Sequence, residues 1–273
     1  MLTPQQQDEF QRLGILRVPG AVPSRDAEAM CDSVWHMLHR NYQIERADPK
    51  TWAGQRIMGT HDLPKSTAFE QIASPTVCEI LDDLLGPANW QRPDRWASLL
   101  VSFPDSREPW EVPHQSWHLD APVVRSLLGL YAVRLFTCLA PLQHSGGATL
   151  AVAGSARLAE DLGRNGGVEK IRSAEVRKAL IQRHRWIRGL CSHDGKTDRI
   201  HGFMNSTSKV GDIELRVVEM VGEPGDVILM HPLTLHAASP NCSEVPRMVL
   251  SSVVNQRGVD WSVLYTDNAA AHP

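Results

Sequence analysis

From about Trp96 onward, the sequence consists of short apolar runs separated by proline, glycine, asparagine and aspartate. This texture predicts antiparallel strands, because apolar runs of this length between turn residues are typical of β-barrels and β-sandwiches. The expected strands cover residues 96–103, 115–120, 129–138, 147–153, 214–221, 226–231, 234–238 and 246–255. We therefore expect a mainly β fold with helical support (α+β), namely a double-stranded β-helix of the jelly-roll, cupin-like kind.

The first third of the chain, residues 1–95, predicts helices that support the β core. One helix begins after Thr3, with proline at its first position, and ends at Gly14 before a short strand. A longer amphipathic helix is expected from Ser24, and a third helix is expected to end at Gly86.

Between Ser155 and about Lys209 the strand pattern gives way to a polar segment with helical stretches. An insertion of roughly 50 residues is too short to form a core of its own, so we expect it to act as a lid. The expected organisation is a single domain over residues 1–273, with helical support at 1–95, jelly-roll core at 96–154 and 210–256, and a lid-like insertion at 155–209.

Charge and cysteine usage exclude several classes of function. The 28 basic and 31 acidic residues give a formal net charge of −3, which favours neither a nucleic-acid nor a membrane-surface partner. The five cysteines form no CxxC pair, so neither a disulfide framework nor a structural zinc site is predicted. With no secretory signal and no long apolar window, we expect a cytoplasmic protein that acts on a small molecule, with a homodimeric state left open.

The segment WHLD places His118 and Asp120 two residues apart. If residues 115–120 form a strand, both side chains point to one face and can meet a single ion. With His236 as third ligand, they form the two-histidine, one-carboxylate triad of non-haem iron(II) oxygenases, which leaves the opposite face of the metal open. An alternative is a hydrogen-bonded surface pair, since a chain with 12 histidines often contains this tripeptide by chance.

Arg247 follows His236 by eleven residues, in PRMVLSSVV. A guanidinium that points inward along a strand is a planar fork suited to a carboxylate. The alternative is a surface arginine at the start of a strand.

In combination, these motifs resemble the phytanoyl-CoA dioxygenase family of iron(II)- and 2-oxoglutarate-dependent oxygenases. The segments that carry the resemblance are LTPQQQDEFQRLGILRVPGAV, WHLD, SGGATLAVAGSARL and GDVILMHPLTLHAASPNCSEVPRMVL. Two motifs depart from the family: the corner reads AGSA instead of PGSH, and Ala238 replaces a serine that often helps to bind the cosubstrate.

The resemblance implies a role for each matching residue. His118, Asp120 and His236 would be the catalytic iron ligands, and Arg247 would pair with the distal carboxylate of 2-oxoglutarate. The pocket of the cosubstrate would also include Ser239, Arg134 and Phe136. The implied cofactors are Fe(II), 2-oxoglutarate as cosubstrate, and O2.

The implied activity is a dioxygenase that hydroxylates an unactivated C–H bond of a small metabolite or natural-product intermediate, with release of succinate and CO2. Related halogenases have alanine or glycine at the position of Asp120, so the carboxylate favours oxidation without halogenation, while desaturation and ring closure stay open. The alternatives are a non-catalytic cupin-like binding module and a zinc hydrolase that uses the same three residues.

Other candidate residues receive structural or secondary roles. We expect His114 to line the pocket, Trp117 to pack in the core or lid, and His231 to be structural rather than a fourth ligand. The remaining cluster forms a solvated helix face, or grips an anionic substrate if the lid closes: Arg185, Trp186 and Arg188.

Overall fold

The computed structural model describes residues 1–55, 57, 67–105 and 109–259. Within these ranges the chain is a mixed, sheet-rich structure, and no described helix is both long and apolar enough to cross a membrane. The helices are α1 (Pro4–Leu13), α2 (Ser24–Tyr42), η1 (Pro49–Thr51), η2 (Thr67–Ile72), α3 (Pro75–Leu85), η3 (Arg125–Leu127), α4 (Ser155–Asn165), α5 (Ser173–Arg183), α6 (Arg185–Leu190) and α7 (Arg199–Phe203). The strands are β1 (Ile15–Val18), β2 (Trp90–Gln91), β3 (Ser98–Ser102), β4 (Val123–Val124), β5 (Ala132–Cys138), β6 (Thr149–Ala153), β7 (Lys170–Ile171), β8 (Ser208–Val210), β9 (Ile213–Glu219), β10 (Val227–Met230), β11 (His236–Ala238) and β12 (Arg247–Gln256).

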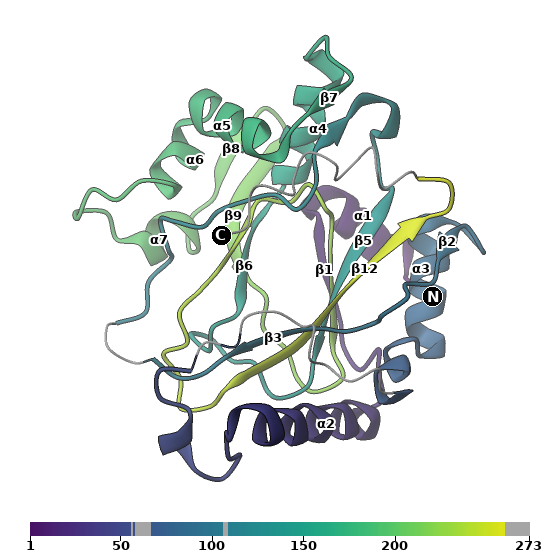
Figure 1. Ribbon diagram of the computed structural model, residues 1–273. Helices are drawn as coiled ribbons and strands as arrows, with labels where there is room; N and C mark the ends of the chain where they lie inside the picture. The colour runs from purple at the N-terminus through teal and green to yellow at the C-terminus, as the bar shows by residue number, and fades with distance from the viewer. Residues whose placement is uncertain (56, 58–66, 106–108, 260–273) are drawn as a thin grey trace.

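The strands form two main antiparallel sheets. The first has six strands in the order β1-β10-β5-β12-β2, with β3 also paired to β12, and the second has four in the order β11-β6-β9-β8. A separate two-stranded sheet joins β4 to β7. Helix α2 runs beside β3, whereas α5, α6 and α7 lie at the opposite end of the molecule beyond β8 and β9 (Figure 1).

Side chains on β5 alternate between two apolar clusters. Val133 and Leu135 belong to a cluster shared with the N-terminal helices, whereas Phe136 and Cys138 belong to one shared with residues of β6 and β9. Because alternate residues of a strand point to opposite faces, the second cluster lies between the two sheets. The inward faces of both sheets therefore enclose a common interior.

The N-terminal helices form where the sequence predicts them. Thr3 caps α1 in a reciprocal capping box with Gln6, and Gly14 ends the helix at φ +72°, a left-handed conformation that favours glycine. Helix α2 begins at Ser24 as expected, and Gly86 follows α3 directly. Their apolar sides pack against the outer face of the first sheet, which makes them the expected support of the β core.

The expected strand at residues 115–120 is wrong. In the described chain this segment belongs to no strand and makes an isolated bridge between His118 and His236. Ser116 has φ +63°, so the backbone turns just before the bridge and cannot continue an extended run. The other strands predicted from Trp96 onward have observed counterparts within a few residues.

Residues 155–209 contain α4 to α7 and the first residues of β8. Their apolar side chains join one cluster with the outer face of the second sheet, including Leu158, Leu180 and Phe203 together with Leu150 and Leu215. The described side chains of this segment thus pack against the second sheet. Its role as a lid stays a prediction.

Candidate metal centre

His118, Asp120 and His236 converge at one point of the structure. Each offers one ligand atom, and these three atoms lie within 4.8 Å of one another. Asp120 Oδ1 is 3.5 Å from Nε2 of His236 and 3.8 Å from Nε2 of His118, and the two imidazole centroids are 4.2 Å apart. The three side chains thus surround a common point that lies within reach of a single ion.

Backbone hydrogen bonds join the two histidines. The N–H of His118 donates to the carbonyl of His236, and the N–H of His236 donates to the carbonyl of His118, both at 2.9 Å. Trp117 anchors the same segment, since its buried indole donates to the carbonyl of Pro113 at 2.8 Å. Fixed backbones on both sides hold the imidazoles in place without a continuous strand at 115–120.

Hydrogen bonds at Nδ1 set the tautomer of both rings. Nδ1 of His118 lies 2.8 Å from the carbonyl of Ser116, and Nδ1 of His236 lies 2.9 Å from the carbonyl of Thr234. A carbonyl oxygen accepts only, so each Nδ1 carries a proton, and in the neutral ring the free lone pair is on Nε2. Burial also lowers the pKa of His236 to about 4, which keeps that ring neutral. Two imidazole Nε2 atoms and a carboxylate oxygen are a donor set that fits iron(II).

Arg134 lies against the other oxygen of Asp120. Its Nε is 2.6 Å from Asp120 Oδ2 in an ion pair whose N–H is not aligned as a hydrogen bond. Its terminal nitrogen donates to Ser251 Oγ on β12 at 2.9 Å. The carboxylate therefore has one oxygen on the imidazole side and the other on the guanidinium side.

Arg247 is a second buried cation between the sheets. It lies at the start of β12 and donates to Thr149 Oγ1, at the start of β6 in the other sheet, at 2.9 Å. Burial lowers the pKa of its guanidinium to about 10, so it stays charged at neutral pH. In the described ranges no carboxylate pairs with it, and its Nε–H is buried without a hydrogen-bond partner. An unpaired buried cation of this kind is complementary to a carboxylate ligand.

A small cavity adjoins Arg247. Its lining comes from both sheets, and in this structure it is too narrow to hold a water molecule. Phe136 and Cys138 of β5 form part of the wall, and Thr149 lies beside the guanidinium. Most of the lining is apolar, and the polar side chains Arg247 and Thr149 lie together.

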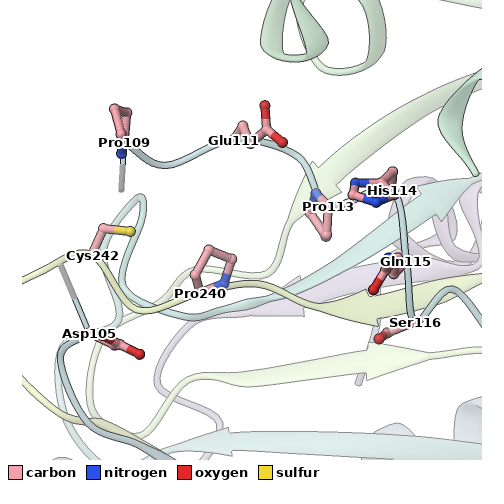
Figure 2. Close-up of a pocket in the computed structure, with 9 residues that line it drawn as sticks. All are labelled: Asp105, Pro109, Glu111, Pro113, His114, Gln115, Ser116, Pro240 and Cys242. Carbon is pink, nitrogen blue, oxygen red and sulfur yellow. The ribbon is translucent and has the colours of Figure 1, made fainter. Parts of the chain in front are cut away.

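A larger open cavity lies beside the histidine bridge. Figure 2 shows the chain from Pro109 to Ser116 along its upper and right sides, with Asp105, Pro240 and Cys242 along the other side. Its volume is about 510 Å³. Ser116 connects this cavity to the ligand cluster, since its carbonyl accepts from Nδ1 of His118.

Comparison with known proteins decides the family. The family model "Phytanoyl-CoA dioxygenase (PhyH)" matches residues 10–249, which is most of the chain. The chain belongs to the phytanoyl-CoA dioxygenase family. Members of this family are iron(II)- and 2-oxoglutarate-dependent oxygenases, and the donor set described above fits that metal. A search of curated proteins found no match.

Solved structures support the same fold. The epimerase SnoN, solved in complex with Fe3+, α-ketoglutarate and nogalamycin RO, is 15% identical and has a TM-score of 0.53, with 92% of this chain and 82% of that chain covered. HygX from Streptomyces hygroscopicus, solved with nickel and 2-oxoglutarate, is 15% identical with a TM-score of 0.53, over 94% of this chain and 88% of that chain. The carbocyclase SnoK from nogalamycin biosynthesis is 15% identical with a TM-score of 0.51, over 93% of this chain and 84% of that chain.

The two departures from the phytanoyl-CoA dioxygenase pattern have distinct surroundings. Ala238 is exposed at the end of β11, and the neighbouring Ser239 is buried, with its hydroxyl donating to the carbonyl of Ala148 at 2.8 Å. A role for Ser239 toward the cosubstrate stays a prediction. In the AGSA corner, Ala156 is buried in the apolar cluster of the second sheet, so this departure affects packing.

Other residues singled out in the sequence lie apart from the ligand cluster. His114 lines the open cavity, with its ring centroid 4.9 Å from that of His193. His231 is buried, and its Nδ1 accepts from the N–H of Leu233 at 3.1 Å, which is a structural role. Trp186 packs against Phe203.

The two arginines on α6 are both exposed, and Arg188 makes hydrogen bonds to the backbone of α5. Arg188 donates to the carbonyls of Ile181 and Gln182 near the end of α5, and Arg185 is exposed. Arg188 therefore caps a helix of the insertion. A contact of either residue with substrate stays a prediction.

Sequence reasoning missed two residues that contact the arginines of this family member. Thr149 bonds Arg247, and Ser251 bonds Arg134. Each was visible only as a polar residue inside an apolar strand, TLAVA and RMVLSSVV. Buried hydroxyls in such strands need partners, so this pattern was the available signal.

Proposed function

We propose that this chain is an Fe(II)- and 2-oxoglutarate-dependent dioxygenase that oxidises, most simply by hydroxylation, an unactivated C–H bond of a small metabolite or natural-product intermediate. Succinate and CO2 would be the coproducts. The observation that carries the proposal is the convergence of His118, Asp120 and His236 in a chain that also buries an unpaired arginine, Arg247. We further propose that the two facing sheets form a double-stranded β-helix and that residues 155–209 cover the site.

His118, Asp120 and His236 would hold the metal, each through one atom. When bound, iron(II) with 2-oxoglutarate supplies the reductive activation of dioxygen that drives oxidation of a C–H bond. The protein's share is to orient both imidazoles with Nε2 toward the metal, which the bonds from Nδ1 to the carbonyls of Ser116 and Thr234 accomplish.

Arg247 and Thr149 would bind the distal carboxylate of 2-oxoglutarate. The guanidinium is already oriented by the threonine hydroxyl and has a further N–H available. A charge-assisted pair with a carboxylate would satisfy that N–H and compensate the buried charge. Phe136 would form an apolar wall along the cosubstrate.

The substrate would enter through the open cavity between residues 109–116 and Pro240 (Figure 2). This cavity meets the ligand cluster at Ser116, and His118 keeps half of its side chain exposed, at 51%. Retention of Asp120 favours oxidation over halogenation, since a halide needs the position that the carboxylate fills. The structural relatives include the carbocyclase SnoK, so the proposal leaves ring closure open beside hydroxylation.

The test is a metabolite-library screen that follows succinate release by the purified full chain with Fe(II), 2-oxoglutarate and dioxygen. We expect substrate-stimulated succinate that is lost on removing oxygen and lost in His236→Ala. Ligand binding without succinate would favour a non-catalytic binding module. Turnover that needs neither oxygen nor 2-oxoglutarate would favour a zinc hydrolase.

A further inference from the structure

We propose that Arg134 is a positioning residue for the metal-binding carboxylate. It holds Asp120 by Oδ2, so that Oδ1 alone faces the metal. This inference rests on the proposed function and assigns Arg134 a role different from the cosubstrate contact expected from the sequence.

The first observation is the division of the Asp120 carboxylate. Oδ1 lies 3.5 Å and 3.8 Å from the Nε2 atoms of His236 and His118, whereas Oδ2 lies 2.6 Å from Nε of Arg134. Rotation of the carboxylate to present both oxygens to the ligand cluster would break the ion pair. The side chains of Asp120 and Arg134 are only 15% and 24% exposed, so water cannot easily replace either partner.

The second observation is that Arg134 is itself held in place. Its strand, β5, is a central strand, paired with β10 on one side and β12 on the other. The terminal nitrogen donates to Ser251 Oγ at 2.9 Å, and the guanidinium carbon lies 5.9 Å from the ring centroid of Phe136. A guanidinium fixed by its strand, a hydroxyl and an aromatic ring can act as a rigid support for a carboxylate.

The consequence concerns the number of coordination positions left free. A carboxylate binds a metal through one oxygen or through both, and a six-coordinate metal with three single-atom protein ligands keeps three vacancies. Two vacancies take the chelating end of an oxoacid, and the third takes dioxygen. Arg134 preserves the third position by keeping Asp120 monodentate.

Metal affinity separates this role from the alternatives. If Arg134 positions Asp120, its loss frees the carboxylate and weakens metal binding, typically by tenfold to a hundredfold for such supporting partners. If Arg134 acts only as a nearby cation, its loss removes repulsion and tightens metal binding. If it only contacts the cosubstrate, its loss weakens 2-oxoglutarate binding and leaves metal affinity unchanged.

The experiment titrates the metal-free full chain with Mn(II) and measures the free ion by electron paramagnetic resonance. The variants are Arg134→Met, Arg134→Lys and Ser251→Ala. The matched control is Arg157→Met, which removes another arginine–aspartate ion pair, Arg157 with Asp212 at 2.6 Å, on the surface. Thermal unfolding of each metal-free variant establishes that it is folded.

We expect the Kd for Mn(II) to rise about tenfold or more in Arg134→Met, less in Arg134→Lys, and a few-fold in Ser251→Ala. The control should match the wild type. Unchanged or tighter Mn(II) binding in both Arg134 variants would overturn the inference, and Ser251→Ala decides the outcome if those variants do not fold. Failure of the wild type itself to bind Mn(II) would instead overturn the proposed function, and this inference with it.

Discussion

The backbone N–H groups of His118 and His236 each donate to the carbonyl oxygen of the other residue, at 2.9 Å. This reciprocal pair, an isolated antiparallel bridge, joins the HxD segment to the start of β11. Because the bridge involves main-chain atoms alone, it persists whichever side chains stand at the two positions. The separation of the metal ligands is thus fixed by the fold, and ligand identity can be changed without dismantling the site.

This bridge leads to different expectations for the two histidine variants. His118→Ala should abolish Mn(II) binding while leaving the free energy of unfolding of the metal-free protein nearly unchanged, because the His118 side chain is 51% exposed. His236→Ala should abolish binding and also destabilise the metal-free protein by about 1–3 kcal/mol, because its side chain is only 7% exposed and donates to the carbonyl of Thr234. Denaturant unfolding in a chelator measures both. Wild-type Mn(II) affinity in either variant would remove that histidine from the metal site.

Replacement of Arg247 should weaken 2-oxoglutarate selectively. Arg247→Lys keeps a charge but loses the fork, and we expect the Kd for 2-oxoglutarate to rise roughly 10- to 100-fold, since hydrogen bonds to charged groups contribute about 1.5–3 kcal/mol. Thr149→Val removes the hydroxyl that orients the guanidinium but keeps the charge of Arg247, and it should raise the Kd for 2-oxoglutarate about three- to tenfold. Calorimetric titration of the Mn(II)-loaded protein measures both, and the KM of the organic substrate should change little. Equal affinity for the oxoacid in wild type and Arg247→Lys would place the cosubstrate elsewhere.

The sequence predicts best the features that depend on neighbouring residues. The helix from Thr3 to Gly14 follows from a capping residue, an N-terminal proline and a glycine that adopts φ +72°. Strands β5 and β12 lie within the ranges that apolar runs between turn residues predict, apart from one residue at the end of β12. Such features need no knowledge of what lies across the fold, and the structure confirms them.

Features that depend on distant partners were predicted less well. Residues 115–120 alternate like a strand, yet φ of +63° at Ser116 and a lone bridge replace the ladder. The contact between Arg134 and Asp120 has no signal in the local sequence, and the role of Arg134 toward the cosubstrate stays a prediction. The three ligand residues were named from family motifs, and the structure brings them together, while their role as metal ligands stays a prediction.

The AGSA corner provides a stability test that does not depend on the metal. Gly154 has φ +81°, and a Cβ there would lie 2.5 Å from the carbonyl oxygen of Glu214, whereas Gly20 has φ +60° with nothing within 4 Å. Alanine at either position should lower the free energy of unfolding by about 1–2 kcal/mol, because an L-residue is strained in the left-handed conformation. Gly154→Ala should lose a further 1–3 kcal/mol or so through the collision with backbone. Denaturant unfolding of the two variants measures the difference, and equal losses would show that the corner has room for a side chain.

Stability should fall on acidification because of His231. Burial lowers the pKa of His231 to about 4 from 6.5, and this effect outweighs a backbone hydrogen bond with Gly129, which raises the pKa. Between these pH values the unfolded chain binds more protons than the folded one, so the free energy of unfolding decreases as pH falls through this window and levels off below about 4. From pH 7 to pH 5 the loss of unfolding free energy due to this residue should be up to about 2 kcal/mol.

The variant His231→Gln tests this assignment, because glutamine keeps an acceptor for the N–H of Leu233. Its free energy of unfolding, measured with denaturant in the presence of a chelator, should decrease less steeply with falling pH than that of the wild type. The buried His236 titrates in the same range and accounts for the slope that remains in the variant, so a variant with the full wild-type slope would contradict the assignment to His231.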